Sequence, residues 1–256
     1  MSFLSEIIER KRRRIASAKQ TTPTGGFELR PNSHRFRQAL LRDGINVIAE
    51  FKRRSPSKGV IRADADLKQI VQSYAAGGAA AISVLTEEDY FSGSLDDLRA
   101  AKKSVNLPVL RKDFIVDEYQ VYESAAAGTD AVLLIVAALE DEQLRRLRRL
   151  IEDELGMDAL IEVHTREEMQ RAIACGANLI GVNNRNLHTF EVSLETSLSL
   201  AANAPPGVVL ISESGLTNAT DLARLHAAGY HGFLIGESLM RSEDPEAALR
   251  ELVSTP

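Results

Sequence analysis

The sequence has 256 residues and a mass of 28.0 kDa, a length at which a single α/β barrel is common. Hydrophobic residues make up 44% of the chain and charged residues 26%, and the net charge of −5 argues against a general nucleic-acid-binding protein. The only cysteine, Cys175, excludes an intramolecular disulfide bond and a cysteine-rich metal site.

Neither the apolar runs nor the first residues predict a membrane or export segment. The longest apolar runs, such as Ala131–Leu139, are too short to span a bilayer, and residues 1–15 lack the uninterrupted apolar core of a signal peptide. We therefore expect a cytoplasmic monomer with no membrane and no nucleic-acid partner. Cys175 is interpreted as a small apolar residue on a helix.

Residues 1–44 are predicted to form an N-terminal helical extension that packs on the main body. Ser5–Lys19 has isoleucines spaced among charges, as in an amphipathic helix, and Phe36–Leu41 is a candidate for a second, short helix. Thr21–Gly26 breaks the chain between them. The basic run Arg10–Arg14 is interpreted as a solvated helix face, because the chain as a whole is acidic; a nucleic-acid patch is the alternative.

From Asn46 onward, short apolar segments of strand length alternate with longer amphipathic segments of helical length. The predicted strands are Asn46–Phe51, Ala80–Leu85, Val109–Lys112, Ala131–Ile135, Ala159–Val163, Leu179–Val182, Val208–Ser212 and Gly232–Ile235. Such alternation predicts a parallel sheet with helical crossovers. The count of eight strands, and a first strand without a following G-x-G-x-x-G turn, favour a closed (β/α)8 TIM barrel over an open doubly wound sheet. Residues 1–256 are thus expected to be one α/β barrel domain.

Four turns that lead into predicted strands place glycine just past a helix end. They are Ala76–Ala79, Ala127–Asp130, Cys175–Asn178 and Ala228–His231. Glycine adopts the left-handed conformation that ends a helix and turns the chain back, so each turn predicts such a residue.

Charged and polar residues follow the predicted strands where each strand ends. Side chains alternate along a strand, so Glu50 and Lys52 project from the same face of the first strand. The others are Lys112, Glu162, Asn183, Arg185 and Glu213. Any one of them alone would be interpreted as an exposed residue or half of an ion pair. Because the active site of such a barrel lies at the carboxyl ends of its strands, we expect these side chains to converge on one mouth.

The last two strands end in small-residue turns, Ser212–Leu216 and Ile235–Leu239. Barrels often bind phosphate in these two loops, where Gly215 and Gly236 would let backbone N–H groups approach an anion. The sequence therefore predicts a phosphate site there.

The histidines do not indicate a metal site. They are scattered, without the paired spacing that metal ligands show, and only one of them follows a predicted strand. They are His34, His164, His188, His226 and His231, and the one at a strand end is His164.

Seven longer motifs follow one another between residues 48 and 240. They are IAEFKRRSPSKG at 48–59, SVLTEEDYFSGSL at 83–95, PVLRKDFIVDEYQ at 108–120, LIEVHT at 160–165, IGVNNRNL at 180–187, ISESG at 211–215 and FLIGESLM at 233–240. In these motifs and their order, the chain resembles the indole-3-glycerol phosphate synthases over residues 44 to 256.

The resemblance implies ring closure of 1-(2-carboxyphenylamino)-1-deoxyribulose 5-phosphate to indole-3-glycerol phosphate, with loss of carbon dioxide and water. It makes Lys112 the general acid, Lys52 the partner of the substrate carboxylate and a candidate for proton transfer, and Glu162 the base or proton partner in dehydration. Glu50 would contact the reacting region. Asn183 and Glu213 would orient the substrate, and Arg185 would bind it by helping to shape the site. The phosphate would lie against Ser55, Ser214, Gly215, Gly236 and Glu237, the last through its backbone. No metal and no organic cofactor is expected, and the partner is a small phosphorylated substrate.

Two segments are expected to cover the site, Arg53–Ile61 and Glu87–Gly93. Two alternatives stay open at this point. One is a different phosphate-sugar barrel enzyme, such as a phosphoribosylanthranilate-type isomerase. The other is a barrel of the same fold that binds a phosphate ligand without converting it.

Overall fold

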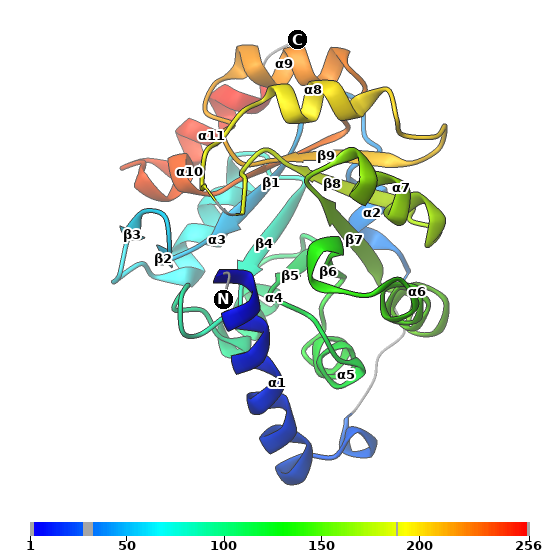
Figure 1. The fold of residues 1–256 in the computed structure, drawn as a ribbon. Coiled ribbons are helices and arrows are strands. Elements are labelled where there is room, and N and C mark those ends of the chain that lie inside the picture. The colour runs from blue at the N-terminus through cyan, green and yellow to red at the C-terminus, as the bar shows by residue number, and fades with distance from the viewer. Residues whose placement is uncertain (1–2, 28–32, 188, 255–256) are drawn as a thin grey trace.

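Eight parallel strands surround the centre of the molecule and close into a barrel (Figure 1). The structure is a computed structural model, and it describes residues 3–27, 33–187 and 189–254, so His188 lies outside the described residues. The barrel strands are β1 (Asn46–Phe51), β4 (Ala81–Leu85), β5 (Val109–Lys112), β6 (Ala131–Ile135), β7 (Asp158–Val163), β8 (Leu179–Asn183), β9 (Val209–Glu213) and β10 (Gly232–Ile235). Each predicted strand is present, with its ends within one residue of the prediction.

The strands follow one another around the barrel in chain order, and β1 closes the ring between β4 and β10. Ile48 pairs with Ala81 on β4, and Asn46 pairs with Gly232 on β10, both in parallel register. The predicted TIM-barrel fold is confirmed.

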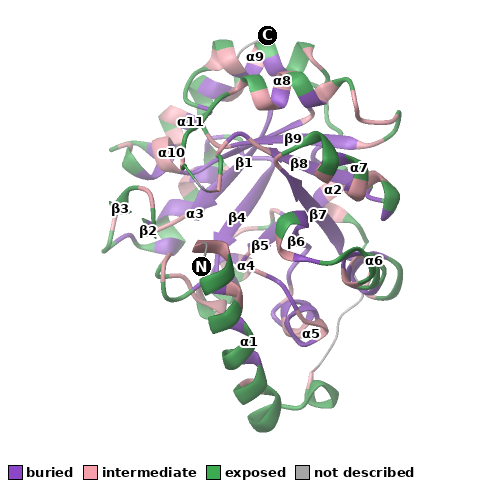
Figure 2. Cartoon of the chain, in the orientation of Figure 1, coloured by how far each residue is buried: buried purple, intermediate pink, exposed green. Residues whose placement is uncertain are grey.

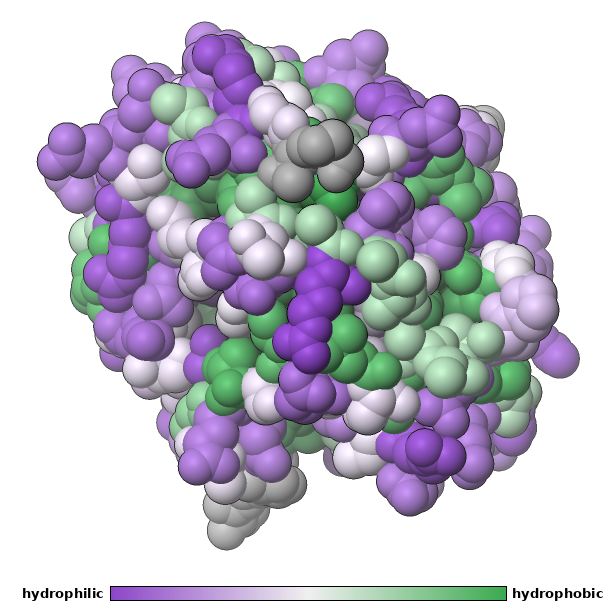
Figure 3. Space-filling view, turned by 90° about the horizontal axis from the view of Figure 1, so that it is seen from above, coloured by the Kyte–Doolittle hydropathy of each residue, from purple (hydrophilic) through white to green (hydrophobic). Residues whose placement is uncertain are grey.

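Helices cover the outside of the barrel. They are α3 (Leu67–Ala76), α4 (Leu95–Ser104), α5 (Glu118–Ala126), α6 (Asp141–Arg149), α7 (Arg166–Ala174), α8 (Glu195–Ala201), α9 (Ala219–Ala227), α10 (Glu237–Arg241) and α11 (Pro245–Val253). The strands and inner helix faces are buried and the outer helix faces are exposed (Figure 2). From above, the surface is mostly hydrophilic with smaller hydrophobic areas between (Figure 3). No helix in the described ranges is long and apolar enough to cross a membrane.

Glycines turn the chain where the sequence predicted them. Gly78, Gly128, Gly176 and Gly229 have φ angles of 94°, 81°, 83° and 100°, in the left-handed region. An L side chain is strained in this region, so glycine lets each helix end and the next strand begin within a few residues.

The N-terminal extension begins with α1 (Phe3–Thr21), followed by a short 3-10 turn at Thr24–Gly26 and by α2 (Arg35–Ala39). Helix α1 contacts α5 and the turn at Val136–Ala138. The predicted solvated basic face is wrong at one position, because Lys11 is only 5% exposed. Its neighbours Arg12, Arg13 and Arg14 are exposed as expected.

The segment Arg53–Ile61, which is expected to cover the site, contains a hairpin. Two short strands, β2 (Arg54–Ser55) and β3 (Gly59–Val60), pair antiparallel as a small hairpin beside the barrel. Pro56 and Lys58 lie in the turn between them.

Helix α2 closes the amino end of the barrel. Phe36 and Leu40 are fully buried, in one cluster with Ile48, Leu110 and Leu160 from the barrel interior. A second cluster fills the space between the strands and the outer helices. Helix α2 therefore covers the apolar layer of the barrel interior at the amino end of the strands.

Phe36→Ala should lower the free energy of unfolding by about 3–5 kcal/mol, because it leaves a cavity beneath the barrel interior. Chemical denaturation monitored by circular dichroism measures the change. The matched control is Leu41→Ala, since Leu41 is 52% exposed and its truncation should change stability by less than about 0.5 kcal/mol. Equal losses in the two variants would show that α2 does not close the barrel.

Candidate functional site

The strand alternation that fills the barrel with apolar side chains also brings charges to its mouth. Ile48 points into the interior, and Glu50, two residues further along β1, points the same way. Leu110 and Lys112 repeat this arrangement on β5. On β7 and β9 the pairs are Leu160 with Glu162 and Ile211 with Glu213. One interior layer is thus apolar, and the next layer towards the carboxyl ends is charged.

These charges line a cavity of about 740 Å³ at the carboxyl ends of the strands. Every residue that the sequence predicted for the site borders this cavity. They are Glu50, Lys52, Ser55, Lys112, Glu162, Asn183, Arg185, Glu213, Ser214, Gly215, Gly236 and Glu237. The predicted convergence on one mouth is therefore what the structure shows.

Lys112 lies between two carboxyl groups. Its Nζ is 3.3 Å from Glu162 Oε2 and 3.4 Å from Glu213 Oε2. Lys52 forms a separate pair, with Nζ 2.7 Å from Glu50 Oε1. The Glu162 and Glu213 side chains are 3% and 1% exposed. A negative charge buried there away from water needs a cation beside it, and the ammonium group of Lys112 is that cation.

The protonation states in this cluster differ from one group to the next. Burial lowers the pKa of Lys112, but Glu162 and Glu213 outweigh it, so the pKa lies above its ordinary value and the ammonium stays charged. Burial raises the pKa of Glu162, but Lys112 and His164 outweigh it and the pKa lies below its ordinary value. Burial also raises the pKa of Glu213, which reaches about 8 because Glu162 and Glu50 add to the effect. The pKa values of these two neighbouring carboxyl groups are therefore shifted in opposite directions.

Glu213 fits only because the neighbouring strand carries glycine. A Cβ atom at Gly181 would lie 2.2 Å from Glu213 Oε1, so any larger residue would displace the carboxyl group. Within the described part of the chain, neither oxygen of Glu213 has a hydrogen-bond donor in good geometry. The group is thus held against Lys112 with hydrogen-bonding capacity left for a ligand.

His164 contacts this cluster from outside the cavity. Its Nε2 is 3.4 Å from Glu162 Oε1, and its Nδ1 is 3.2 Å from Glu168 Oε2. Burial lowers the pKa of His164, but the hydrogen bond with Glu168 and the charge of Glu162 outweigh it, so the pKa is raised. His164 does not border the cavity. Its effect on a ligand would therefore pass through Glu162.

An aromatic wall, formed by Phe91 and Phe114, borders the cavity, and sequence reasoning did not assign it. Phe91 and Phe114 lie with ring centroids 6.3 Å apart, and Phe3 of α1 lies 5.9 Å from Phe190. Phe114 directly follows the strand-end pair Lys112–Asp113, and this position could have identified it. The sequence carries no local signal for Phe3, because only the docking of α1 brings it to the barrel.

The predicted phosphate turns follow β9 and β10, and in the order of the strands β9 lies across the barrel from β5, which Phe114 follows. Ser214 and Gly215 both have positive φ angles, of 68° and 79°, so the chain bends sharply after β9. Gly236 precedes α10, and the Ser238 hydroxyl of that helix is buried with no hydrogen-bond partner among the described residues. A buried hydroxyl bordering a cavity without a partner is available to a ligand.

Two cations beside these turns were also missed by sequence reasoning. Lys58 Nζ is 3.7 Å from Glu237 Oε1, and Arg241 Nε is 3.3 Å from the same oxygen. All three residues border the cavity. The Glu237 side chain is thus occupied by its neighbours, in keeping with a predicted contribution through its backbone.

Metal ligands do not gather in the described ranges: no group of three or more His, Cys, Asp or Glu residues is placed to hold an ion. Cys175 is buried at the end of α7, and its thiol donates to Ala172 O at 3.1 Å.

The chain is similar to one family throughout the region that forms the barrel. The sequence model of the family described as indole-3-glycerol phosphate synthase matches residues 4–252. A protein of that name from Carboxydothermus hydrogenoformans is 47% identical, over 98% of this chain and 100% of its own. Another from Koribacter versatilis is 48% identical, over 98% of this chain and 99% of its own.

Solved structures at low sequence identity share the fold. A thiamine phosphate pyrophosphorylase from Pyrococcus furiosus is 17% identical and superposes with a TM-score of 0.60, covering 81% of this chain and 93% of its own. A protein named KGPDC from Streptococcus mutans is 13% identical, with a TM-score of 0.62, covering 82% and 96%. At such identities the likeness concerns the fold alone.

Glu213→Gln should stabilise the folded protein more at about pH 8 than at about pH 5. Because the pKa of Glu213 is raised from 4.5 to about 8, the folded protein keeps a proton that the unfolded chain releases across that window. Stability from this group therefore falls as pH rises, by at most about 1.4 kcal/mol per pH unit, and glutamine abolishes the effect.

The measurement is the difference in unfolding free energy between variant and wild type at both pH values. Glu251→Gln is the control, because Glu251 is exposed on α11 and its replacement should give the same small difference at each pH. A pH-independent difference for Glu213→Gln would contradict the raised pKa.

Proposed function

The chain belongs to the indole-3-glycerol phosphate synthase family, and from this membership we propose how its own side chains carry out the reaction. The protein is a carboxy-lyase of tryptophan biosynthesis. The names of its relatives favour neither the isomerase nor the non-catalytic binder. The substrate is 1-(2-carboxyphenylamino)-1-deoxyribulose 5-phosphate, and the product is indole-3-glycerol phosphate.

One observation supports the residue assignments above all others. The cavity has a charged floor formed by Glu50, Lys52, Lys112, Glu162 and Glu213, between an aromatic wall and two small-residue turns. The substrate has the same order of parts, with an aryl carboxylate at one end, a carbonyl in the middle and a phosphate at the other end. A single orientation therefore satisfies all three parts.

In that orientation the aryl ring packs against Phe91 and Phe114, and its carboxylate pairs with Lys52. The phosphate lies against Ser55, Ser214, Gly215, Gly236 and the backbone of Glu237, with the unpartnered Ser238 hydroxyl as an additional donor. Arg185, whose Nη1 donates to Phe190 O at 3.1 Å, holds the loop that shapes the aromatic side. Fixing both ends places the carbonyl carbon within reach of the ring carbon that attacks it.

Lys112 is the general acid of ring closure. The attack of the ring carbon on the carbonyl creates negative charge on the carbonyl oxygen, which a positioned ammonium stabilises and protonates. The charge of Glu162 keeps the ammonium protonated until the substrate arrives. Loss of the carboxylate as carbon dioxide then restores the aromatic ring.

Glu162 is the base of the dehydration step. Its pKa lies below the ordinary value, so it is ionised at neutral pH and can accept the proton whose removal expels water. Glu213, protonated below about pH 8, donates a hydrogen bond and orients the substrate together with Asn183. Glu50 holds Lys52 beside the reacting region.

Each of these steps is a proton transfer or a rearrangement of bonds that charged side chains can assist, so the chemistry calls for no metal and no organic cofactor. The hairpin segment Arg53–Ile61 and the segment Glu87–Gly93 act as covers. Ser55, Pro56, Ser57 and Lys58 of the first segment and Phe91 of the second already border the cavity. Their closure excludes water from the reacting carbons.

The enzyme works as a cytoplasmic monomer without a nucleic-acid partner, with residues 1–256 as one barrel domain and 1–44 as its N-terminal extension. The acidic net charge of −5 supports the absence of a nucleic-acid partner. The small phosphorylated substrate is its partner.

Lys112→Ala should lower kcat for indole-3-glycerol phosphate formation by about 10²- to 10⁴-fold, because the general acid is lost. The dissociation constant of the product should change by less than about threefold, since the phosphate turns and the aromatic wall stay intact. Lys103→Ala is the matched control, because Lys103 is exposed on α4 and should retain full activity. Near-normal turnover in Lys112→Ala would overturn the assignment of the general acid.

A further inference from the structure

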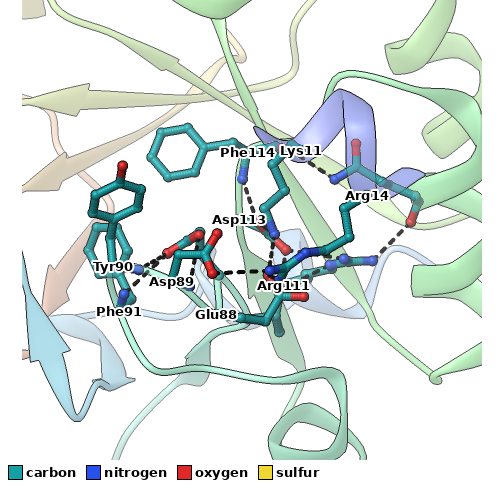
Figure 4. Close-up of polar contacts among 12 residues, drawn as sticks. Lys11, Arg14, Glu88, Asp89, Tyr90, Phe91, Arg111, Asp113 and Phe114 are labelled. Carbon is teal, nitrogen blue, oxygen red and sulfur yellow. Dashed lines mark hydrogen bonds and ion pairs between the residues drawn. The ribbon is translucent and has the colours of Figure 1, made fainter. Parts of the chain in front are cut away.

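One lysine of α1 differs from its neighbours on this helix. Arg10 and Arg13 are exposed and pair with Glu6 and Glu9 along the helix. The side chain of Lys11 is only 6% exposed, and its Nζ lies 2.8 Å from Asp113 Oδ1 and 2.9 Å from Glu88 Oε2 (Figure 4). Burial of an ammonium is costly unless it is paired, so this side chain has a specific counterpart in the barrel.

The counterpart, Asp113, directly follows the general acid. Its Oδ2 accepts hydrogen bonds from Thr86 Oγ1 at 2.6 Å and Arg111 Nη2 at 3.1 Å. Its Oδ1 accepts one from the backbone N–H of Phe114 at 2.8 Å. On the other side, the carbonyl oxygen of Lys112 accepts from Thr86 N at 3.1 Å. The carboxylate therefore fixes the backbone around Lys112 and the aromatic residue Phe114.

Asp113 depends on two cations for its charge. Burial raises its pKa, but Lys11 and Arg111 outweigh it and hold the pKa well below its usual range. Arg111 is shared, because its Nη1 also lies 2.9 Å from Glu123 Oε2 and donates to Ser124 Oγ at 3.0 Å. Lys11 is thus the cation that balances Asp113 from the side of the N-terminal extension.

We propose that Lys11 is a positioning residue of the active site, which through Asp113 fixes the backbone that carries Lys112 and Phe114. This inference rests on the proposed role of Lys112 as the general acid. Lys11 touches no substrate and does not border the cavity. Its contribution should therefore appear in the chemical step, where a small displacement of the acid is costly, and much less in binding.

Loss of this charge leaves α1 docked, because other contacts hold the helix. Ile7 and Ile15 are buried, and Phe3 packs edge-on against Tyr90 with ring centroids 5.0 Å apart. Lys19 Nζ is 2.8 Å from Asp117 Oδ2 on the loop before α5. The aromatic wall should therefore keep its place when Lys11 is replaced.

The test compares Lys11→Met with Lys11→Arg and Arg12→Met, in steady-state assays of product formation and in titrations with indole-3-glycerol phosphate. Lys11→Met should lower kcat about tenfold or more while the product dissociation constant changes by less than about threefold. Lys11→Arg, which keeps the charge, should recover most of kcat. Arg12→Met removes an exposed charge from the next position on α1 and should behave as wild type.

A double variant, Lys11→Met with Asp113→Asn, covers the case in which the single variant does not fold. It leaves no unpaired buried charge, so it should fold and bind product, yet keep the low kcat because the carboxylate no longer fixes the backbone. The proposal is overturned if either variant keeps kcat within about twofold of wild type, or if product affinity falls as much as kcat. Inactive wild-type protein would instead refute the proposed function itself.

Discussion

The arrangement of the barrel mouth depends on the position of Lys112 between two buried carboxyl groups. Two ammonium groups, on Lys52 and Lys112, face three carboxyl groups there, on Glu50, Glu162 and Glu213. With all five ionised the cluster would carry one excess negative charge in a poorly solvated site. The raised pKa of Glu213 removes that charge at neutral pH. The two ammonium and three carboxyl groups therefore carry no net charge together when the substrate, with its carboxylate and its phosphate, approaches the mouth.

Burial and the surrounding charges also shift the pKa values of two chemically similar carboxyl groups in opposite directions. Glu162 has Lys112 on one side and His164 on the other, and stays ionised. Glu213 sits in the space left by Gly181 with one nearby cation and keeps its proton. Environments that push the pKa values of neighbouring groups apart are how enzymes assign acid and base roles at one pH. The fold supplies these environments through strand alternation and a single glycine.

Strand-end charges and turn glycines could be predicted from the sequence because both follow local rules. The alternation that sets Ile48 and Glu50 on one face is a property of any strand, and the βα rhythm then places all strand ends together. The burial of Lys11 could not be predicted in this way, because Lys11 lies in a run of basic residues whose arginines are exposed on the same helix. Its burial depends on Asp113, far away in the sequence. Phe3 reaches the cavity for the same reason, through the docking of α1.

The most direct measurement is to mix the purified protein with 1-(2-carboxyphenylamino)-1-deoxyribulose 5-phosphate, in the presence of a metal chelator, and to follow indole fluorescence. We expect a fluorescence increase that saturates with substrate concentration and is unaffected by the chelator. A flat trace from protein that still binds the substrate would contradict it, and would leave a phosphate-binding barrel whose charged mouth serves another purpose.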